Sequence, residues 1–150
     1  MKFVIQRVDQ ASVSVDGNVI GSIEQGYVIL VGVSNTDTRD IADRMLKKTL
    51  GLRLFPDENG KTNLSLSQVK GELLIISQFT LYANCRKGNR PSFTEAGGAE
   101  LAEELYQYIL EQAKTQCDRV ESGEFGAHMS ISLTNNGPFT ILLDSEQILK

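Results

Sequence analysis

Residues on which metal and redox sites are usually built are scarce in this chain, which has one histidine and two cysteines among its 150 residues. The cysteines, Cys85 and Cys117, lie far apart and form no Cys-x-x-Cys pair, so we expect free thiols rather than a redox motif or a zinc site. The single histidine, His128, precedes an alternating segment and is predicted to lie on the polar face of a strand. The sequence therefore predicts no metal, no cofactor and no histidine-based catalytic triad.

Long hydrophobic runs are also lacking, and none approaches the ~20 residues that a membrane-spanning helix needs. Polar residues interrupt the first positions of the chain, which is not the pattern of a secretory signal, so a cytoplasmic protein without a membrane segment is expected. The net charge of −4 argues against indiscriminate nucleic-acid binding, although it leaves a local cationic patch open. At this length, one domain over residues 1–150 is expected.

Apolar residues in strand-like patterns occupy both ends of the chain. Residues 11–15 alternate, and the Asp16-Gly17 turn predicts a hairpin that returns over residues 18–24. Residues 27–33 form a continuous β-branched run, which is typical of a strand buried on both faces. Further strands are predicted at residues 3–8, 71–79, 118–122, 129–134 and 139–143.

Two segments have the apolar spacing of helices. One begins after Asp37, the predicted N-cap, and the other runs over roughly residues 98–116. The order is several strands, a helix, a strand, a helix and several strands. It predicts a mixed α/β fold with three layers (β/β/α), in which a strand-rich, barrel-like portion has both helices on one side.

A first candidate site lies at the polar end of the strand over residues 71–79, where Ser77, Gln78, Phe79 and Thr80 follow a strongly apolar run. Because the segment has no acid, histidine or cysteine, we expect it to act through its backbone, with N–H groups of Gln78 to Thr80 stabilising an oxyanion. Thr80 as a nucleophile is an alternative, although no neighbouring base is present. A purely structural role, in which the Ser77 and Thr80 hydroxyls satisfy local backbone groups, is also open.

A second candidate site is the dipeptide Gly137-Pro138, which interrupts an apolar β segment. A turn is the ordinary explanation. A glycine before proline relieves the steric restriction that proline imposes on its predecessor, so the sequence leaves the isomer of this bond open.

Three cations gather in one loop, at Arg86, Lys87 and Arg90. A solvated loop is one explanation. The other is an edge beside residues 77–83 that contacts phosphates and positions an RNA backbone without reading its sequence.

Six segments combine into one pattern that spans nearly the whole chain: residues 5–8, 77–82, 87–88, 90–93, 123–129 and 135–140. In this combination and order, they resemble the D-aminoacyl-tRNA deacylases, also called D-tyrosyl-tRNA deacylases. The family's pattern usually has a smaller aliphatic residue where this chain has Phe139, a departure that changes the packing behind the dipeptide and leaves the dipeptide intact.

The resemblance implies a cytoplasmic homodimer that hydrolyses the ester between a D-amino acid and the 3′-terminal adenosine of tRNA, with the ribose 2′-hydroxyl assisting. Glycyl-tRNA, including glycine mischarged on tRNA-Ala, is expected as a second substrate. A cis Gly137-Pro138 would enter the partner's pocket. There its carbonyl oxygens would bind the substrate amine and leave no room for an L side chain. Backbone groups of Gln78, Phe79 and Thr80 would hold the ester carbonyl, with supporting roles for Arg7, Ser77, Asn135 and Met129.

Two other functions stay open from the residues alone. One is a non-catalytic RNA-binding module that uses the loop over residues 86–90. The other is a different small hydrolase in which Thr80 is the nucleophile.

Overall fold

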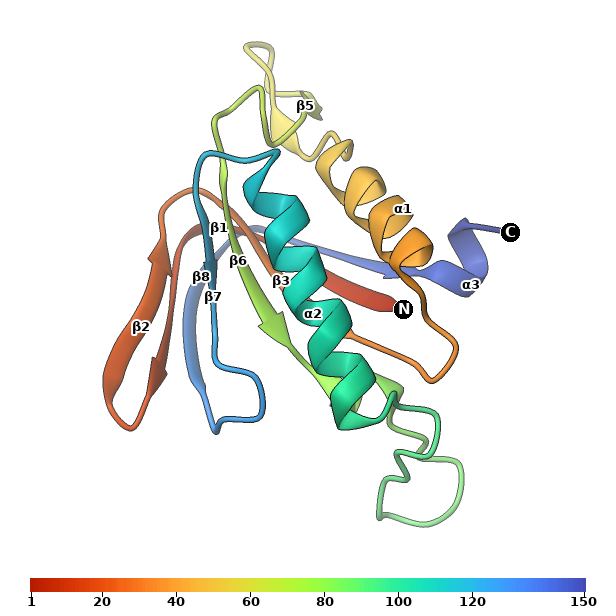
Figure 1. The fold of residues 1–150 in the computed structure, drawn as a ribbon. Helices are drawn as coiled ribbons and strands as arrows, with labels where there is room; N and C mark the ends of the chain where they lie inside the picture. Colours follow the sequence, from red (N-terminus) through yellow and green to blue (C-terminus); the bar gives the residue numbers. More distant parts are fainter.

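A computed structural model describes all residues, 1–150, and its main element is one mixed six-stranded sheet (Figure 1). The strand order is β2 (Asn18–Ile23), β1 (Lys2–Val15), β3 (Gly26–Gly32), β6 (Glu72–Ser77) and β7 (Val120–Ser122), and β8 (Ser130–Asp144) also pairs with β1. Strand β6 pairs in parallel with both β3 and β7, and the other pairs in this sheet are antiparallel.

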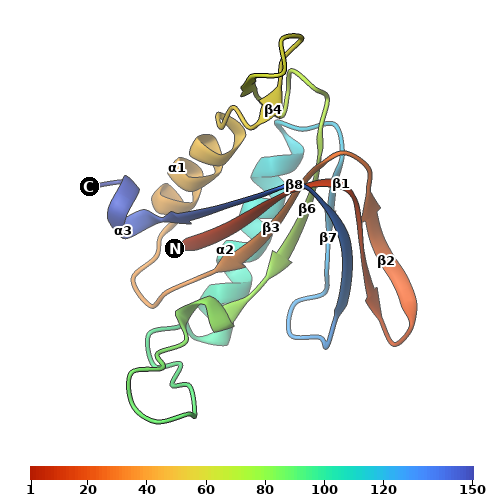
Figure 2. The same ribbon diagram turned by 180° about the vertical axis from the view of Figure 1, so that it is seen from behind.

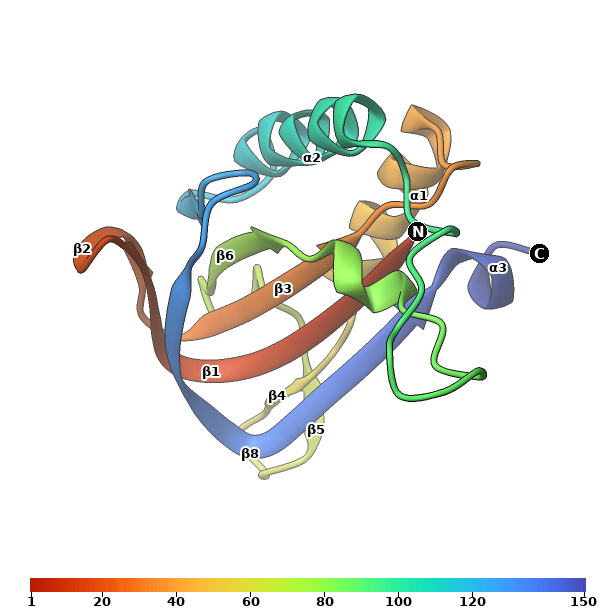
Figure 3. The same ribbon diagram turned by 90° about the horizontal axis from the view of Figure 1, so that it is seen from below.

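The two longest strands, β1 and β8, run beside one another along most of their length (Figure 2). On its other side, β1 pairs first with β3 and then with β2. Its register with β2 shifts after Val13, and such irregularities bend a strand and increase its twist. These bends in the long strands allow the sheet to curl (Figure 3).

The curled sheet is nearly closed, because its edge strands β2 and β7 approach one another. At Gly21 of β2, a Cβ atom would lie 3.1 Å from the carbonyl oxygen of Ser122 in β7. Just before β7, Nη2 of Arg119 donates a hydrogen bond of 3.0 Å to the carbonyl oxygen of Ser22. The predicted barrel-like β portion is confirmed.

Helices α1 (Arg39–Leu50) and α2 (Ala99–Lys114) lie on the same side of the sheet (Figures 1 and 3). None of the helices is long and apolar enough to cross a membrane. The mixed α/β class with two main helices on one side, predicted from the sequence, is also confirmed. The shorter elements are the strands β4 (Phe55–Pro56) and β5 (Thr62–Leu64), the 3₁₀ helix η1 (Phe79–Tyr82) and α3 (Ser145–Ile148).

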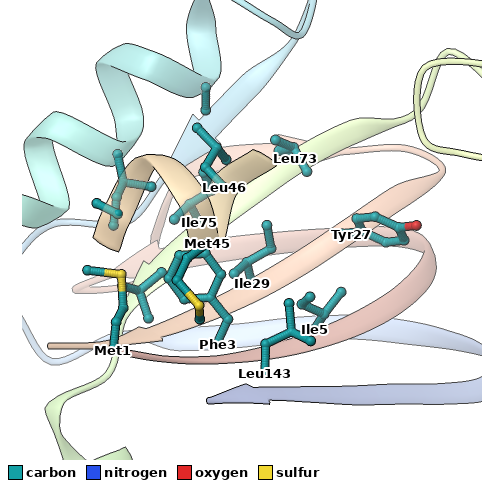
Figure 4. Packing of buried hydrophobic residues seen from close by; sticks show 14 of the residues in the cluster. Met1, Phe3, Ile5, Tyr27, Ile29, Met45, Leu46, Leu73, Ile75 and Leu143 are labelled. Atoms are coloured by element: carbon teal, nitrogen blue, oxygen red, sulfur yellow. The ribbon is translucent and has the colours of Figure 1, made fainter. Parts of the chain in front are cut away.

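Two hydrophobic cores lie on the two faces of the sheet, which accounts for the three layers. The larger packs Met45 and Leu46 of α1 against strand residues such as Phe3 and Ile29 (Figure 4). The smaller fills the inside of the curl with residues such as Val8 and Leu74. Strand β3 contributes to both cores, as expected for a strand buried on both faces.

Three local predictions were wrong. The N-cap of α1 is Thr38, not Asp37, because the Asp37 carboxylate instead accepts hydrogen bonds from the Met1 amine and the Ser34 N–H, at 2.6 and 2.7 Å. The predicted strand over residues 71–79 ends at Ser77, and Phe79 begins the 3₁₀ helix η1. The two strands expected at residues 129–134 and 139–143 are one strand, β8.

Candidate active site

A largely apolar pocket of about 450 Å³ opens where β6 ends and η1 begins. Residues 76–79 form one wall, and Ala99 and Ala102 at the start of α2 form another. Residues 125–129, which lead into β8, together with Ile131 on that strand and Gly97 before α2, complete the lining. A concave, mostly apolar pocket with a few polar groups is the usual form of a small-molecule site.

The pocket wall over residues 76–79 is rigid because it continues a buried parallel strand. The N–H of Gln78 donates to the carbonyl oxygen of Val31 at 2.7 Å, which extends the pairing of β6 with β3 by one residue. The chain then turns into η1, where Leu81 packs closely on β3. If Gly32 of β3 carried a Cβ atom, that atom would lie only 2.9 Å from the Cβ of Leu81. Buried Tyr106 of α2 supports the strand by donating from its hydroxyl to the carbonyl oxygen of Ile75, at 2.7 Å.

Two backbone donors at the start of η1 are free. The N–H groups of Phe79 and Thr80 make no hydrogen bond within the protein, as is usual for the first residues of a helix. The Gln78 N–H, the third donor predicted from the sequence, is already paired with Val31 and is therefore not free. Of these two residues, Phe79 lines the pocket, whereas Thr80 follows it in η1 and is not part of the lining.

Polar side chains near these donors are few. The Gln78 amide nitrogen donates to the Thr80 hydroxyl oxygen, and no ionisable side chain forms a hydrogen bond with that hydroxyl. His128 lines the same pocket and precedes β8. The sequence favoured a place on the polar face of a strand for His128, and the structure places it in the pocket lining just before that strand. No group of three or more His, Cys, Asp or Glu side chains is arranged to hold a metal ion.

The dipeptide Gly137-Pro138 protrudes from the ladder between β1 and β8. Gln6 pairs with Thr140 and Val8 with Asn135, so residues 136–139 lie opposite Arg7 alone and form a bulge. Both residues of the dipeptide are exposed, their peptide bond is cis, and Gly137 has φ +130°. Few L side chains adopt this backbone conformation, and it favours glycine.

Arg7 anchors this bulge from β1. Its Nε donates to the carbonyl oxygen of Asn136 and its Nη2 to Oδ1 of the same residue, both at 3.0 Å. Its Nη1 donates to the carbonyl oxygen of Leu54, and Asn136 in turn donates to Asp9 at 2.7 Å. The residue directly before Gly137 is therefore held by a nearly buried guanidinium group.

The pocket and the dipeptide, which the sequence predicted to act together, do not meet within one chain. Neither Gly137 nor Pro138 lines the pocket. Of the predicted supporting residues, Ser77 and Met129 do line it, whereas Asn135 is exposed on β8 opposite Val8.

The cationic loop is closed at its base and extends into solvent. Asn84 and Ser92 exchange two backbone hydrogen bonds, of 2.7 and 3.0 Å. Between them, Arg86, Lys87 and Arg90 are exposed, and none forms an ion pair. Their charges are therefore available to a partner.

Sequence reasoning missed the contribution of α2 to the site. Ala99 and Ala102 line the pocket, and Gly97 before the helix lies so close to Ser34 that a Cβ there would be 3.0 Å from its carbonyl oxygen. The paired glycines before this helix were the only available signal, because small residues permit such close approach. Phe125, another wall of the pocket, lay within a segment that carried the family resemblance but was given no role.

The chain is similar over nearly its whole length to proteins of one known family. The family model "D-Tyr-tRNA(Tyr) deacylase" matches residues 4–144. The D-aminoacyl-tRNA deacylase of Clostridium novyi (strain NT) is 52% identical, over 98% of this chain and 99% of that protein. The D-aminoacyl-tRNA deacylase of Thermosipho africanus (strain TCF52B) is 49% identical, over 99% of each chain.

Two solved structures are similar in fold. The c-Myc DNA unwinding element binding protein is 41% identical, with a TM-score of 0.91 over 96% of this chain and 98% of that one. A probable eukaryotic D-amino acid tRNA deacylase has a TM-score of 0.83 over 95% of this chain and 97% of that one. The second is only 17% identical, so its likeness concerns the fold alone.

Proposed function

Because the chain belongs to the D-Tyr-tRNA(Tyr) deacylase family and is a D-aminoacyl-tRNA deacylase, we propose that two copies of it build each active site. One copy supplies the pocket at the start of η1, and the other inserts Gly137 and Pro138. The observation that carries this proposal is that the dipeptide protrudes from β8 and yet does not line the pocket of its own chain. In the proposed dimer, the dipeptide of the second copy forms a further wall of this pocket.

The dipeptide enforces chirality by excluding L side chains. Arg7 and Phe139 pack closely against Gly137. A Cβ atom on Gly137 would lie 3.2 Å from Arg7 Nη2 and 3.0 Å from the backbone nitrogen of Phe139. Rigid backbone cannot move aside for a substrate side chain, so a misplaced L side chain is rejected by steric clash. Glycine has no side chain to exclude, so glycyl-tRNA, including glycine mischarged on tRNA-Ala, is a second substrate.

The free N–H groups of Phe79 and Thr80 bind the ester carbonyl. As water adds to this carbonyl, negative charge develops on its oxygen, and two fixed donors stabilise that charge. The bond to the ribose 3′-oxygen then breaks, which releases the D-amino acid and a tRNA with a restored hydroxyl. The ribose 2′-hydroxyl assists the proton transfers, since no acidic or basic side chain forms a hydrogen bond with the Thr80 hydroxyl.

The cationic loop holds the RNA. The exposed Arg86, Lys87 and Arg90 side chains contact phosphates near the 3′ end, which positions the tRNA without reading its sequence. We place this activity in the cytoplasm, where charged tRNA is used. Residues 1–150 act as one domain, because both cores pack on the same sheet.

Release of tyrosine from charged tRNA tests the function directly. With the enzyme at a small fraction of substrate, D-tyrosine should be released over many turnovers and L-tyrosine should stay bound to its tRNA. A non-catalytic RNA-binding module would instead retain the tRNA without turnover, with steep salt dependence. Stoichiometric binding without release of D-tyrosine would contradict the proposal.

The role of the ribose 2′-hydroxyl is tested with a modified substrate. D-Tyrosyl-tRNA ending in 2′-deoxyadenosine, esterified at the 3′ position, should bind comparably to the normal substrate and be cleaved much more slowly. Equal single-turnover rates for the two substrates would exclude the 2′-hydroxyl and direct attention to His128 or Thr80.

A further inference from the structure

Two phenylalanine rings meet at the rim of the pocket and remain open to solvent. Phe79 and Phe93 form an edge-to-face pair with their centroids 5.1 Å apart and their planes at 66°. Their exposed fractions are 55% and 37%, which is high for such large apolar side chains. An edge-to-face pair covers at most one face of either ring, so each ring keeps a face available to a ligand.

The rings lie between the pocket and the cationic loop. Phe79 lines the pocket, and Phe93 follows Ser92, which closes the base of the loop by its hydrogen bonds to Asn84. The three cations of that loop are exposed and unpaired with acidic groups. Exposed aromatic rings beside a cationic strip are the combination that binds single-stranded nucleic acid, by stacking on bases and attracting phosphates.

We propose that Phe79 and Phe93 form a stacking platform for a nucleobase of the single-stranded 3′ end of tRNA. The inference rests on the proposed function, because that function places the aminoacyl ester in the adjoining pocket and the phosphates on the loop. A base that lies between the pocket and the cationic loop is then in reach of the exposed rings. Removal of a stacking ring typically weakens binding by roughly fivefold to more than a hundredfold per base.

Phe93 is the residue to change, since it has no part in the proposed chemistry. Phe93→Leu keeps an apolar side chain but removes the ring, whereas Phe93→Tyr keeps the ring and is the matched control. Val19→Thr, at another exposed apolar position, controls for general surface effects. The probes are the trinucleotide CpCpA and a trinucleotide with the same phosphates but no bases.

The trinucleotides separate stacking from charge. Phe93→Leu should weaken CpCpA binding at least fivefold and leave the baseless probe unchanged, and both control variants should bind like the wild type. Equal weakening for both probes would mean that the ring only shapes the loop, and would overturn the platform. Unchanged CpCpA binding, or a shift from dimer to monomer in Phe93→Leu, would overturn it as well.

Kinetics identify which base stacks. A higher KM for both D-tyrosyl-tRNA and the D-tyrosyl ester of adenosine would assign the platform to the terminal adenine. A higher KM for the tRNA alone would assign it to a preceding base, and unchanged KM for both would overturn the proposal. Wild-type protein that binds CpCpA through Phe93 but releases no D-tyrosine would contradict the proposed function and leave the platform standing.

Discussion

The guanidinium carbon of Arg7 lies 4.7 Å from the centre of the Phe139 ring, so the ring faces a nearly buried cation. Arg7 is 9% exposed and has no acidic partner within ion-pair distance. Its charge is therefore stabilised by carbonyl and amide oxygens of neighbouring residues and by the face of this ring. Arg7 and Phe139 together enclose Gly137, the residue proposed to select the chirality of the substrate.

Loss of the Phe139 ring should therefore weaken the anchor of the bulge. We predict that Phe139→Leu lowers the free energy of unfolding by about 1–2 kcal/mol, because a desolvated cation–π contact is worth about that much. Discrimination between D- and L-tyrosyl-tRNA should fall with it. Urea unfolding and parallel release assays measure both effects.

Phe139→Tyr, which keeps the ring, is the control and should resemble the wild type in both measurements. Wild-type stability and wild-type discrimination in Phe139→Leu would show that the ring contributes nothing to the position of Arg7.

Arg7→Lys should be damaging although it keeps the charge. A lysine cannot reproduce the planar fork that donates to Leu54 and twice to Asn136, so at least one buried carbonyl group loses its donor. We expect a loss of about 1–3 kcal/mol in the free energy of unfolding and a fall in kcat/KM for D-tyrosyl-tRNA. Arg53→Lys, a matched change at an exposed arginine, should alter neither quantity.

Thr80 should contribute little through its hydroxyl. Thr80→Ser should be nearly silent, and Thr80→Ala should lose less activity than a change at Gly137 or Pro138, since the N–H of residue 80 is kept in both variants. Single-turnover rates on D-tyrosyl-tRNA measure this. If Thr80→Ala abolished turnover in a folded dimer while Thr80→Ser retained it, the hydroxyl would be catalytic.

Stability at high pH should depend on Tyr106, which supports β6. Burial raises the pKa of Tyr106 to about 12, from about 10 in an unfolded chain. A raised pKa means that folding favours the neutral phenol, so this contribution is complete below pH 10 and is lost as the pH rises to about 12.

Tyr106→Phe cannot titrate and provides the comparison. At pH 9 it should be less stable than the wild type by about 1 kcal/mol, because the Ile75 carbonyl loses its donor. The difference should shrink between pH 10 and 12, as measured by urea unfolding. A constant difference over that range would contradict the raised pKa.

The fold was largely predictable because apolar periodicity reports burial. The β-branched run of β3 and the helical spacing of α1 and α2 correspond to the buried faces of these elements. The continuity of β8 was not predictable, since Gly137-Pro138 resembles a turn and only its pairing with β1 on both sides makes it a bulge. Asp37 was misassigned because its partner, the Met1 amine, is remote in sequence.

The residues of the site were predictable only in part. The polar end of β6 indicated the pocket wall, and the structure places Ser77, Gln78 and Phe79 there. Sequence did not indicate that the Gln78 N–H is occupied by Val31, because that depends on the pairing of β3 with β6. The contribution of α2 depends on how the helix docks, which local patterns do not determine. The roles of Gly137, Pro138 and the cationic loop stay predictions.

The most direct test of the intersubunit site uses two inactive variants. Gly137→Val disables the dipeptide, because valine strongly disfavours φ +130° and its Cβ would crowd Phe139. Phe79→Pro removes one of the two free donors, and proline is tolerated at the first position of a helix. Each variant alone should release little D-tyrosine from D-tyrosyl-tRNA.

The measurement is the release of D-tyrosine after the two variants have been mixed and their exchange into heterodimers verified by native mass spectrometry. In a heterodimer, the intact pocket of the Gly137→Val chain meets the intact dipeptide of the Phe79→Pro chain. Activity should recover to about a quarter of the wild-type value after complete exchange, because about half of the dimers are mixed and each regains one of its two sites. Verified heterodimers without recovered activity would show that the pocket and the dipeptide do not act across the dimer.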